Sequence, residues 1–496
     1  MRLIAPKFWT KYISHMAKFC SIVIVFFFCI CFIDLFSVEV AAAGRNLRHD
    51  DEAGTLHDHY HHVKVSSLSP RQSCMSSPKG KKQDATLEVV HSYGPCSKRN
   101  PDETSHPTHS EILERDEARV KYIHSRVSLP TADKVAASAV TLPAKSGISI
   151  GSGNYLVSVG LGTPARQLNL IFDTGSDFTW TQCQPCVATC YSQVDAIFNP
   201  SASSTYTNIS CSSAACASIA SATSASPGCA ASTCVYGIQY GDSSFSVGFY
   251  GTETLTLTPG NVFPNFKFGC GENNQGFRGS DGLLGLGRNQ VSAFSQVATK
   301  YGQYFSYCLP TRSGSGGSLT FGNSGSASSA TVYAPLLSNS QNPTFYFLSL
   351  QGITVGGIKL SISPSVFSTA GTIIDSGTVI TRLPPAAYSA LKTTFKQLMS
   401  NYPTTSALSI LDTCYDFSSY TTISVPVITL LFSNGAQVRL GIPGILYGTR
   451  SQTCLAFAGN SDSSSMGILG NTQQQTFNVI YDVAGGRLGF GPGSCS

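Results

Sequence analysis

Two short segments in different halves of the chain share one pattern. In each, an apolar strand ends in an aspartate, and a hydroxyl residue and then a glycine follow the aspartate. They are LIFDTGS, which contains Asp173, and TIIDSGT, which contains Asp375. The glycine allows a tight turn and close backbone approach directly after the acid. Two such turns meeting at a pseudo-twofold axis would place two carboxylates within about 3 Å of each other. Such a pair titrates as one unit, because both members cannot ionise at that distance.

The segments around the two acids also repeat in the same order. NYLVSVGLGTP precedes the first acid and FYFLSLQGITVGG precedes the second, and both alternate as strands do. An apolar pair that ends in glycine follows each acid, Leu283-Leu284-Gly285 in one half and Ile468-Leu469-Gly470 in the other. Repeated order of this kind predicts two similar lobes that face each other.

Helical patterns are few after residue 153 and are confined to 292–302 and 384–402. We therefore predict an all-β, bilobal fold with a few short helices. The predicted lobes are residues 148–335 and 336–496.

The charge balance and the histidine content limit which partners the lobes can recruit and which catalytic groups they can use. Residues 146–496 contain 13 Lys and Arg against 12 Asp and Glu, so they lack the overall field that recruits nucleic acid or a membrane. The last histidine is His124, which excludes a Ser-His-Asp triad, a Cys-His pair and a histidine-ligated metal in the lobes. We expect a metal-free, cofactor-free hydrolysis in which one aspartate activates water and the other polarises a carbonyl.

The amino-terminal segment has the features of a targeting sequence. Basic residues precede an apolar run from Phe19 to Ile33, and the small residues Ala41-Ala42-Ala43 follow it. This pattern predicts a secretory signal peptide over 1–43, with a membrane anchor and a plastid transit peptide as the alternatives. We expect a secreted monomer with no membrane anchor in its mature form.

Residues 44–147 are predicted to be a removable prosegment, with a cut near 145–152. SEILERDEARVKYIHSRVS at 110–128 has apolar residues near one helical face and charges opposite. HDDEAGTLHDHYHH at 49–62 is polar and is predicted to be disordered, its histidines leaving metal binding as an alternative.

From Ile148 to its end, the chain resembles the pepsin-like aspartic proteases. DTGS at 173–176 and DSGT at 375–378 match the two motifs of that family. The resemblance implies a polypeptide substrate and roles for the residues that support the two acids. Thr174 and Ser376 would join the two turns, Ser176 and Thr378 would hydrogen-bond the outer carboxylate oxygens, and Gly175 and Gly377 would complete the turns.

The resemblance extends to residues beyond the two acids. Trp180 matches a tryptophan seven residues past the first acid, and Tyr240 with Gly241 matches the tip of the flap hairpin. Gly241 would allow the tip of the hairpin to change conformation, and both Tyr240 and Gly241 would contact substrate.

Twelve cysteines lie in 183–495, an even number that favours disulfides over a zinc site at Cys183, Cys186 and Cys190. The cysteine-rich insert, FGCGENNQG and GNTQQQTFNVIYD resemble the plant nepenthesin-type subgroup. That resemblance implies six pairs: Cys183–Cys186, Cys190–Cys270, Cys211–Cys234, Cys216–Cys229, Cys308–Cys495 and Cys414–Cys454.

Three further features leave alternatives open. Asn208 begins a glycosylation sequon in the cysteine-rich insert. The chain also resembles protease-like plant inhibitors of cell-wall hydrolases, which would make it a binding protein. It also resembles a chloroplast-nucleoid aspartic protease. In such a protein PKGKKQ at 78–83 would contact nucleic acid. Its few lysines provide few phosphate contacts, so nucleic acid is an unfavoured partner.

Overall fold

The computed structural model describes residues 59–68, 74, 86–98, 107–128, 155–240, 243–312, 314, 316–323, 327–493 and 495. The predicted signal peptide, the basic cluster at 78–83, the predicted cut and Gly241 lie outside these residues. Within the described ranges, no helix combines the length and the hydropathy that crossing a membrane requires.

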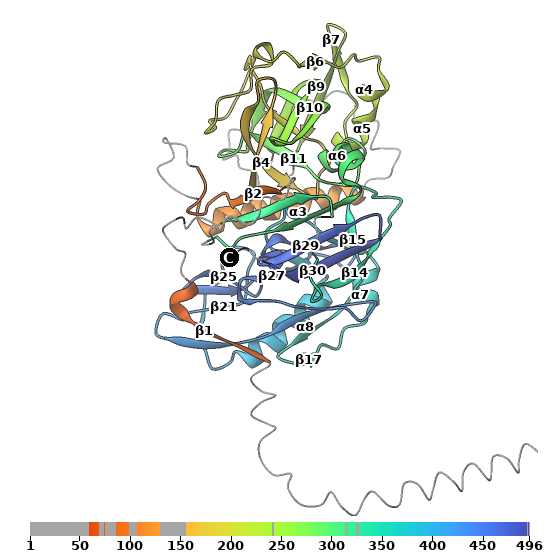
Figure 1. The fold of residues 1–496 in the computed structure, drawn as a ribbon. Helices are drawn as coiled ribbons and strands as arrows, with labels where there is room; N and C mark the ends of the chain where they lie inside the picture. The colour runs from red at the N-terminus through yellow and green to blue at the C-terminus, as the bar shows by residue number, and fades with distance from the viewer. Residues whose placement is uncertain are drawn as a thin grey trace, which may run out of the picture. The chain divides into compact units, whose positions relative to one another are not determined.

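Short strands dominate the described chain, which confirms the predicted β fold (Figure 1). The first half after the predicted prosegment contains strands and short helices in this order: β3 (Tyr155–Leu161), β4 (Arg166–Asp173), β5 (Trp180–Gln182), η2 (Pro200–Ala202), β6 (Thr207–Asn208), α4 (Ala214–Ser218), α5 (Ala220–Thr223), β7 (Gly228–Ala230), β8 (Thr233–Gln239), β9 (Phe245–Thr258), β10 (Asn261–Gln275), β11 (Gly282–Gly285), α6 (Ala293–Tyr301), β12 (Tyr304–Cys308) and β13 (Gly317–Phe321).

The second half has the same character. Its elements are β14 (Val332–Leu337), β15 (Tyr346–Leu348), β16 (Leu350–Val355), β17 (Ile358–Lys359), α7 (Ser365–Ser368), β18 (Thr372–Ile374), β19 (Thr381–Leu383), α8 (Pro385–Leu398), β20 (Thr404–Thr405), β21 (Cys414–Tyr415), β22 (Thr422–Pro426), β23 (Ile428–Phe432), β24 (Gln437–Arg439), η3 (Ile442–Gly444), β25 (Leu446–Thr449), β26 (Gln452–Leu455), β27 (Phe457–Gly459), β28 (Gly467–Leu469), η4 (Asn471–Gln474), β29 (Phe477–Asp482) and β30 (Arg487–Pro492).

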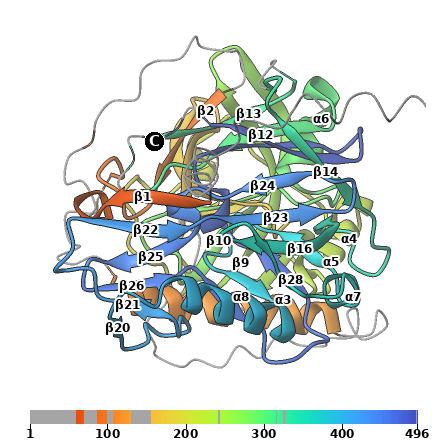
Figure 2. The same cartoon turned by 90° about the horizontal axis from the view of Figure 1, so that it is seen from below.

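The segment predicted as a prosegment supplies four ordered elements, β1 (Tyr60–Lys64), η1 (Val65–Leu68), β2 (Thr86–His91) and α3 (His109–Ser128). β1 pairs antiparallel with β22 (Figure 2), and β2 pairs antiparallel with both β3 and β13. β2 is therefore an internal strand of the sheet that joins the two halves, in which β12 also pairs with β13 and with β29.

Disorder was predicted for the whole of 49–62, and this is wrong for its end. Tyr60, His61 and His62 are part of β1, where the ring of His61 hydrogen-bonds the carbonyl of Leu440 at 2.9 Å and that of His62 contacts Ser424. Pairing with β22 gives these backbone groups hydrogen bonds that the polar composition alone did not suggest.

All twelve cysteines of residues 183–495 form disulfides, but four of the six predicted pairs are wrong. Cys308–Cys495 and Cys414–Cys454 form as predicted. The other pairs are Cys183–Cys270, Cys186–Cys190, Cys211–Cys229 and Cys216–Cys234, and Cys74–Cys96 links two cysteines of the predicted prosegment.

Strand pairing and burial explain the corrected pairs. β5 runs parallel to β10, which places Cys183 beside Cys270 in the core, while Cys186 and Cys190 follow in a more exposed loop. Cys229 and Cys234 face each other across the β7–β8 hairpin. Of these two, the buried Cys234 bonds the buried Cys216 of α4.

Candidate active site

Both aspartates end apolar strands in the protein core and are fully buried, at 0% exposure each. Asp173 ends β4 and Asp375 follows β18 directly. The apolar pairs noted in the sequence support these strands: β11 runs parallel to β4 with Gly285 opposite Asp173, and β28 runs parallel to β18. The repeated order of the sequence thus corresponds to the same local construction in both halves.

The turns after the two acids bond to each other. The backbone N–H of Thr174 donates to Ser376 Oγ at 3.0 Å, and the N–H of Ser376 donates to Thr174 Oγ1 at 2.9 Å. This reciprocal pair of buried hydrogen bonds fixes one turn against the other across the two halves.

Each carboxylate receives the same two hydrogen bonds within its own turn. Gly175 N–H donates to Asp173 Oδ1 and Gly377 N–H donates to Asp375 Oδ1, both at 2.9 Å. The Ser176 hydroxyl donates to Asp173 Oδ2 at 2.7 Å. In the second turn, Thr378 donates to Asp375 Oδ2 at 2.5 Å.

Both glycines of these turns lie against the opposite acid. A Cβ placed on Gly175 would come within 2.5 Å of Asp375 Oδ1, and one on Gly377 within 2.5 Å of Asp173 Oδ1. No side chain fits at these positions, so glycine is required for the two carboxylates to approach each other.

Tyr240 and Trp180 meet beside the acids. Tyr240 follows β8, and its backbone N–H donates to the carbonyl of Ser244, closing the hairpin to β9. The buried indole of Trp180 donates to the Tyr240 hydroxyl at 2.9 Å. Edge contacts of both rings with Phe277 hold the half-buried tyrosine in this position.

Arg119 of α3 contacts both catalytic candidates at once. Its Nη2 lies 2.8 Å from Asp173 Oδ1 and 2.9 Å from Asp375 Oδ2, and its Nε lies 3.1 Å from Asp375 Oδ2. α3 crosses between the strands of the two halves (Figure 1). One guanidinium nitrogen therefore marks a position shared by the two carboxylates, as expected for a pair that works as a unit.

The two carboxyl groups differ in proton affinity. Burial pushes the pKa of Asp173 upward, but Arg119 and the hydrogen bond from Ser176 outweigh it and leave this pKa below its usual value. Burial raises the pKa of Asp375, and the charge of Asp173 adds to that increase against the opposing effect of Arg119. The environment thus favours one ionised and one protonated member, the division of labour that general acid–base catalysis needs.

Comparisons with known proteins show the family to which the chain belongs. Family models described as xylanase inhibitor N-terminal and xylanase inhibitor C-terminal match residues 155–323 and 345–492. An aspartyl protease family protein of Arabidopsis thaliana is 54% identical over 91% of this chain and 96% of its own length. Nepenthesin-2 of Nepenthes gracilis, an aspartic proteinase, is 40% identical over 70% of this chain and 78% of its own.

The chain belongs to the pepsin-like aspartic protease family.

Solved structures support the fold of this aspartic protease family member. The crystal structure of edgp has a TM-score of 0.55 and 20% identity, over 68% of this chain and 91% of that one. Basic 7S globulin from soybean has a TM-score of 0.54 and 22% identity, over 68% and 93%. The two family models lie within the predicted lobes, whose boundaries stay predictions.

α3 covers the aspartic protease dyad with more than Arg119. Its Ile112 and Leu113 pack with Val379 and Ile380 on one side of the dyad. Its Val120 and Ile123 pack on the other side with a second apolar cluster, which contains Phe345, Phe347, Ile373, Met466 and Ile468. The apolar face predicted from the sequence is therefore buried against the second half of the protease.

Two acids of the same helix bind a buried arginine of the protease body. Asp116 contacts Arg382 Nη1 at 3.1 Å, and Glu117 contacts Arg382 Nη2 at 3.2 Å. Asp116 Oδ1 and Oδ2 also accept hydrogen bonds from the backbone N–H groups of Val379 at 2.5 Å and Ile380 at 3.1 Å. Sequence reasoning missed Arg119, Asp116 and Arg382, although the first two interrupt the apolar face of the predicted helix.

Asn208, the predicted glycosylation site, is exposed in β6. Its amide oxygen accepts a hydrogen bond from the Tyr206 hydroxyl at 2.8 Å. Exposure is what a modified asparagine requires, and glycosylation stays a prediction.

Proposed function

We propose that this protein is an aspartic endopeptidase made as an inactive precursor, in which α3 occupies the active site. The observation that carries the proposal is the contact of Arg119 Nη2 with both Asp173 and Asp375. An intact dyad with its supporting hydroxyls supports peptide hydrolysis, and the arginine bound to it supports inhibition before activation.

The reaction we propose begins once the dyad is free of Arg119. The ionised aspartate takes a proton from a water bound between the carboxylates, and the water attacks the substrate carbonyl. The protonated aspartate donates to the carbonyl oxygen, and a proton then passes to the leaving amine. The reciprocal bonds of Thr174 and Ser376 keep the two carboxylates in register, and Tyr240 would close over the extended polypeptide.

A direct assay tests this function. The full-length chain is held at about pH 4, near the carboxylate pKa range, and mixed with a denatured protein substrate with and without pepstatin. We expect cleavage that pepstatin blocks, while the Asp375→Asn variant gives none. Absence of cleavage by the processed wild-type protein would contradict the proposal.

The descriptions of the two matching families favour one competing function, inhibition of a xylanase by a protein that cleaves nothing. Such a function does not need two carboxylates with matched hydroxyl donors. The same preparation is therefore also assayed against a xylanase. Inhibition of that enzyme without pepstatin-sensitive proteolysis would establish the competing function.

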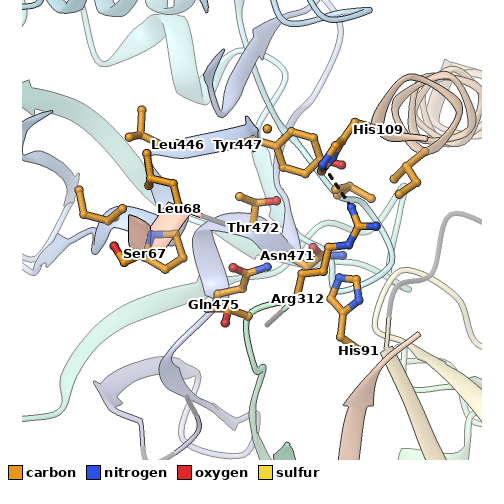
Figure 3. Close-up of a pocket in the computed structure, with 16 residues that line it drawn as sticks. Ser67, Leu68, His91, His109, Arg312, Leu446, Tyr447, Asn471, Thr472 and Gln475 are labelled. Atoms are coloured by element: carbon orange, nitrogen blue, oxygen red, sulfur yellow. Dashed lines mark hydrogen bonds between the residues drawn. The ribbon is translucent and has the colours of Figure 1, made fainter. Parts of the chain in front are cut away.

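Two histidines of the predicted prosegment support activation by acid. His91 at the end of β2 and His109 at the start of α3 line a cavity of about 210 Å³ together with Arg312 of the protease body (Figure 3). Arg312 Nη1 lies 3.2 Å from His109 Nε2, and the backbone N–H of Tyr93 donates to His91 Nδ1 at 3.1 Å. The rings of Tyr155 and Tyr447 pack edge-on against His91 and His109 respectively.

Both histidines are held neutral by this environment. Burial lowers the pKa of His91 to about 3, with Arg312 and His109 adding to the effect. Burial likewise lowers the pKa of His109 to about 4, with Arg312 adding to it. A released prosegment would return both to about 6.5, so the docked state binds fewer protons. The contribution of the two histidines to docking of the prosegment is fully present above about pH 6.5. It is lost as the pH falls toward 4.

Asp116 opposes this effect in part. Burial raises its pKa, against Arg382 and two backbone donors, so acid favours the docked form of this one group. Burial also lowers the pKa of His124 on α3, so three histidines oppose this one carboxyl. Acid therefore favours release of the prosegment, by about 1.4 kcal/mol for each proton taken up and each pH unit.

Replacing both histidines should therefore shift activation to lower pH. We expect the double variant His91→Asn/His109→Gln to release its prosegment with a midpoint lower by about one pH unit, because the two charges no longer form beside Arg312. The measurement is the fraction of shortened chain after a fixed time between pH 3 and pH 7. His62→Gln, at an exposed position of β1, is the control, and an unchanged midpoint in the double variant would contradict the histidine role.

We also propose that the protein is exported. The disulfides of the described residues, including Cys74–Cys96 in the predicted prosegment, are stable in an oxidising compartment. A fluorescent protein fused after residue 50 should enter the secretory route. Accumulation in plastids would overturn the proposal in favour of the chloroplast alternative.

A further inference from the structure

The contact between Asp116 and the protease body has the geometry of a bound ligand. The Asp116 carboxylate is fully buried at 0% exposure and is held by one guanidinium nitrogen and two backbone N–H groups. All three donors belong to a short stretch that begins four residues after Asp375. Donors arranged in this way around a carboxylate make a strong, charge-assisted site.

Arg382 cannot be explained by the protease body alone. It is 1% exposed and lies in β19, where its Nη1 also donates to the carbonyl of Ile380 at 2.7 Å. Among the described residues, both of its acidic partners, Asp116 and Glu117, belong to α3. Once α3 leaves, a guanidinium beside the active site loses both partners, which is costly unless another anion replaces them.

The position of this site relative to the dyad is set by the helix. Asp116 precedes Arg119 by three residues, which is about 4.5 Å along the axis of an α-helix. An extended peptide advances about 3.3 Å for each residue. A side chain about one or two residues from the scissile bond would therefore reach the donors that Asp116 occupies in the precursor.

We propose that Arg382 and the backbone N–H groups of Val379 and Ile380 form a substrate subsite for an aspartate or glutamate side chain, which Asp116 fills in the precursor. The inference rests on the proposed function and adds a substrate class to it, namely peptides with a carboxylate close to the cut. Arg382 is a specificity-determining residue in this account, because its contact is with the substrate side chain and not with the reacting atoms.

Burial under α3 raises the pKa of Asp116 in the precursor. A substrate side chain in the open cleft is less desolvated, so we expect Arg382 to bind it in its ionised form, which gives the subsite a pH signature. A substrate aspartate has a pKa of about 3.9 and a glutamate about 4.3. Preference for an acidic residue over its amide should therefore be full at about pH 5.5 and should fall as the pH approaches 3. A preference caused by shape alone would not change in this way.

The test compares peptides that differ in one group. A peptide cleaved by the full-length chain after acid activation is made as Asp and Asn versions at each of the four positions on either side of the cut. We expect kcat/KM at about pH 5.5 to be roughly tenfold or more higher for Asp than for Asn at one position, as a charge-assisted hydrogen-bonded contact implies. At about pH 3 the ratio should approach one.

Two variants assign the preference to Arg382. In Arg382→Met the ratio of the Asp to the Asn peptide should fall to about one. Arg487→Met alters an arginine of β30 that pairs with Asp482, and it should keep the wild-type ratio. A general loss of activity in Arg382→Met does not affect the result, because the measured quantity is the ratio of kcat/KM for the two peptides. If that variant fails to fold, the peptide series on the wild-type protein still tests the inference.

The outcomes separate this inference from the proposed function. Equal rates for Asp and Asn peptides at every position, with both peptides cleaved, would overturn the subsite and leave the endopeptidase intact. Failure to cleave any peptide would overturn both. An Asp preference that persists in Arg382→Met would place the carboxylate site elsewhere and contradict the inference.

Discussion

Replacing Asp375 by Asn is expected to lower kcat for peptide hydrolysis at least about a thousandfold. Asparagine keeps the shape of the side chain and can still accept from Gly377 N–H, but it cannot take or give a proton. General acid–base catalysis by one group contributes about 10² to 10⁴-fold, and the two aspartates act as one unit. Asp173→Asn should have an effect of the same order, which initial rates on a short peptide will measure.

The Asp375→Asn variant is expected to fold as well as the wild-type protein. Burial raises the pKa of Asp375, so the folded state already favours a neutral side chain there, and asparagine supplies one. Thermal unfolding of the processed proteins should give an equal or higher midpoint for Asp375→Asn. Loss of folding would show that the acids are structural, and near-normal turnover in either variant would contradict the dyad mechanism.

Replacing Arg119 by Met should activate the intact precursor. Removing one partner of a buried ion pair costs about 3–5 kcal/mol, and here Asp173 and Asp375 lose the same cation. α3 should therefore dock less tightly. We expect the intact Arg119→Met precursor to cleave a short peptide at about pH 6 at least tenfold faster than the intact wild-type precursor.

A neighbouring lysine provides the control for this experiment. Lys121 lies on the same helix, its side chain is 74% exposed, and it contacts Glu117 at 3.6 Å. Lys121→Met should leave the precursor as inactive as the wild type. Electrophoresis before and after the assay shows that the chain is uncut, and an uncut, folded Arg119→Met precursor without activity would contradict inhibition by Arg119.

The sequence was sufficient to predict the architecture around the two acids. Asp173 and Asp375 ended apolar strands in repeated surroundings, and the structure joins their turns through Thr174 and Ser376. Local signals carried this prediction, because a buried acid after a strand, a hydroxyl and a glycine are all adjacent along the chain. The helix over 110–128 was also predicted from its apolar spacing and appears as α3.

Contacts between distant segments could not be predicted in the same way. Arg119 and Asp116 interrupt the apolar face of a predicted helix, which signals a polar partner, but the partners lie more than two hundred residues away for Asp375 and Arg382. Four of the disulfide pairs that the family resemblance implied were wrong for a related reason. The order of the cysteines along the chain does not show that β5 runs parallel to β10, and this pairing places Cys183 beside Cys270.

Because β2 lies between β3 and β13, cleavage of the chain and release of the prosegment would be two separate steps. A single cut between α3 and β3 breaks one peptide bond and leaves both hydrogen-bonded edges of β2 intact. The cleaved prosegment would then stay bound as a second polypeptide. The protein would give two bands in a denaturing gel but a single species under native conditions. In the proposed activation, the mature form would require a second step, in which β2 leaves the sheet and β3 and β13 lose their pairing with it.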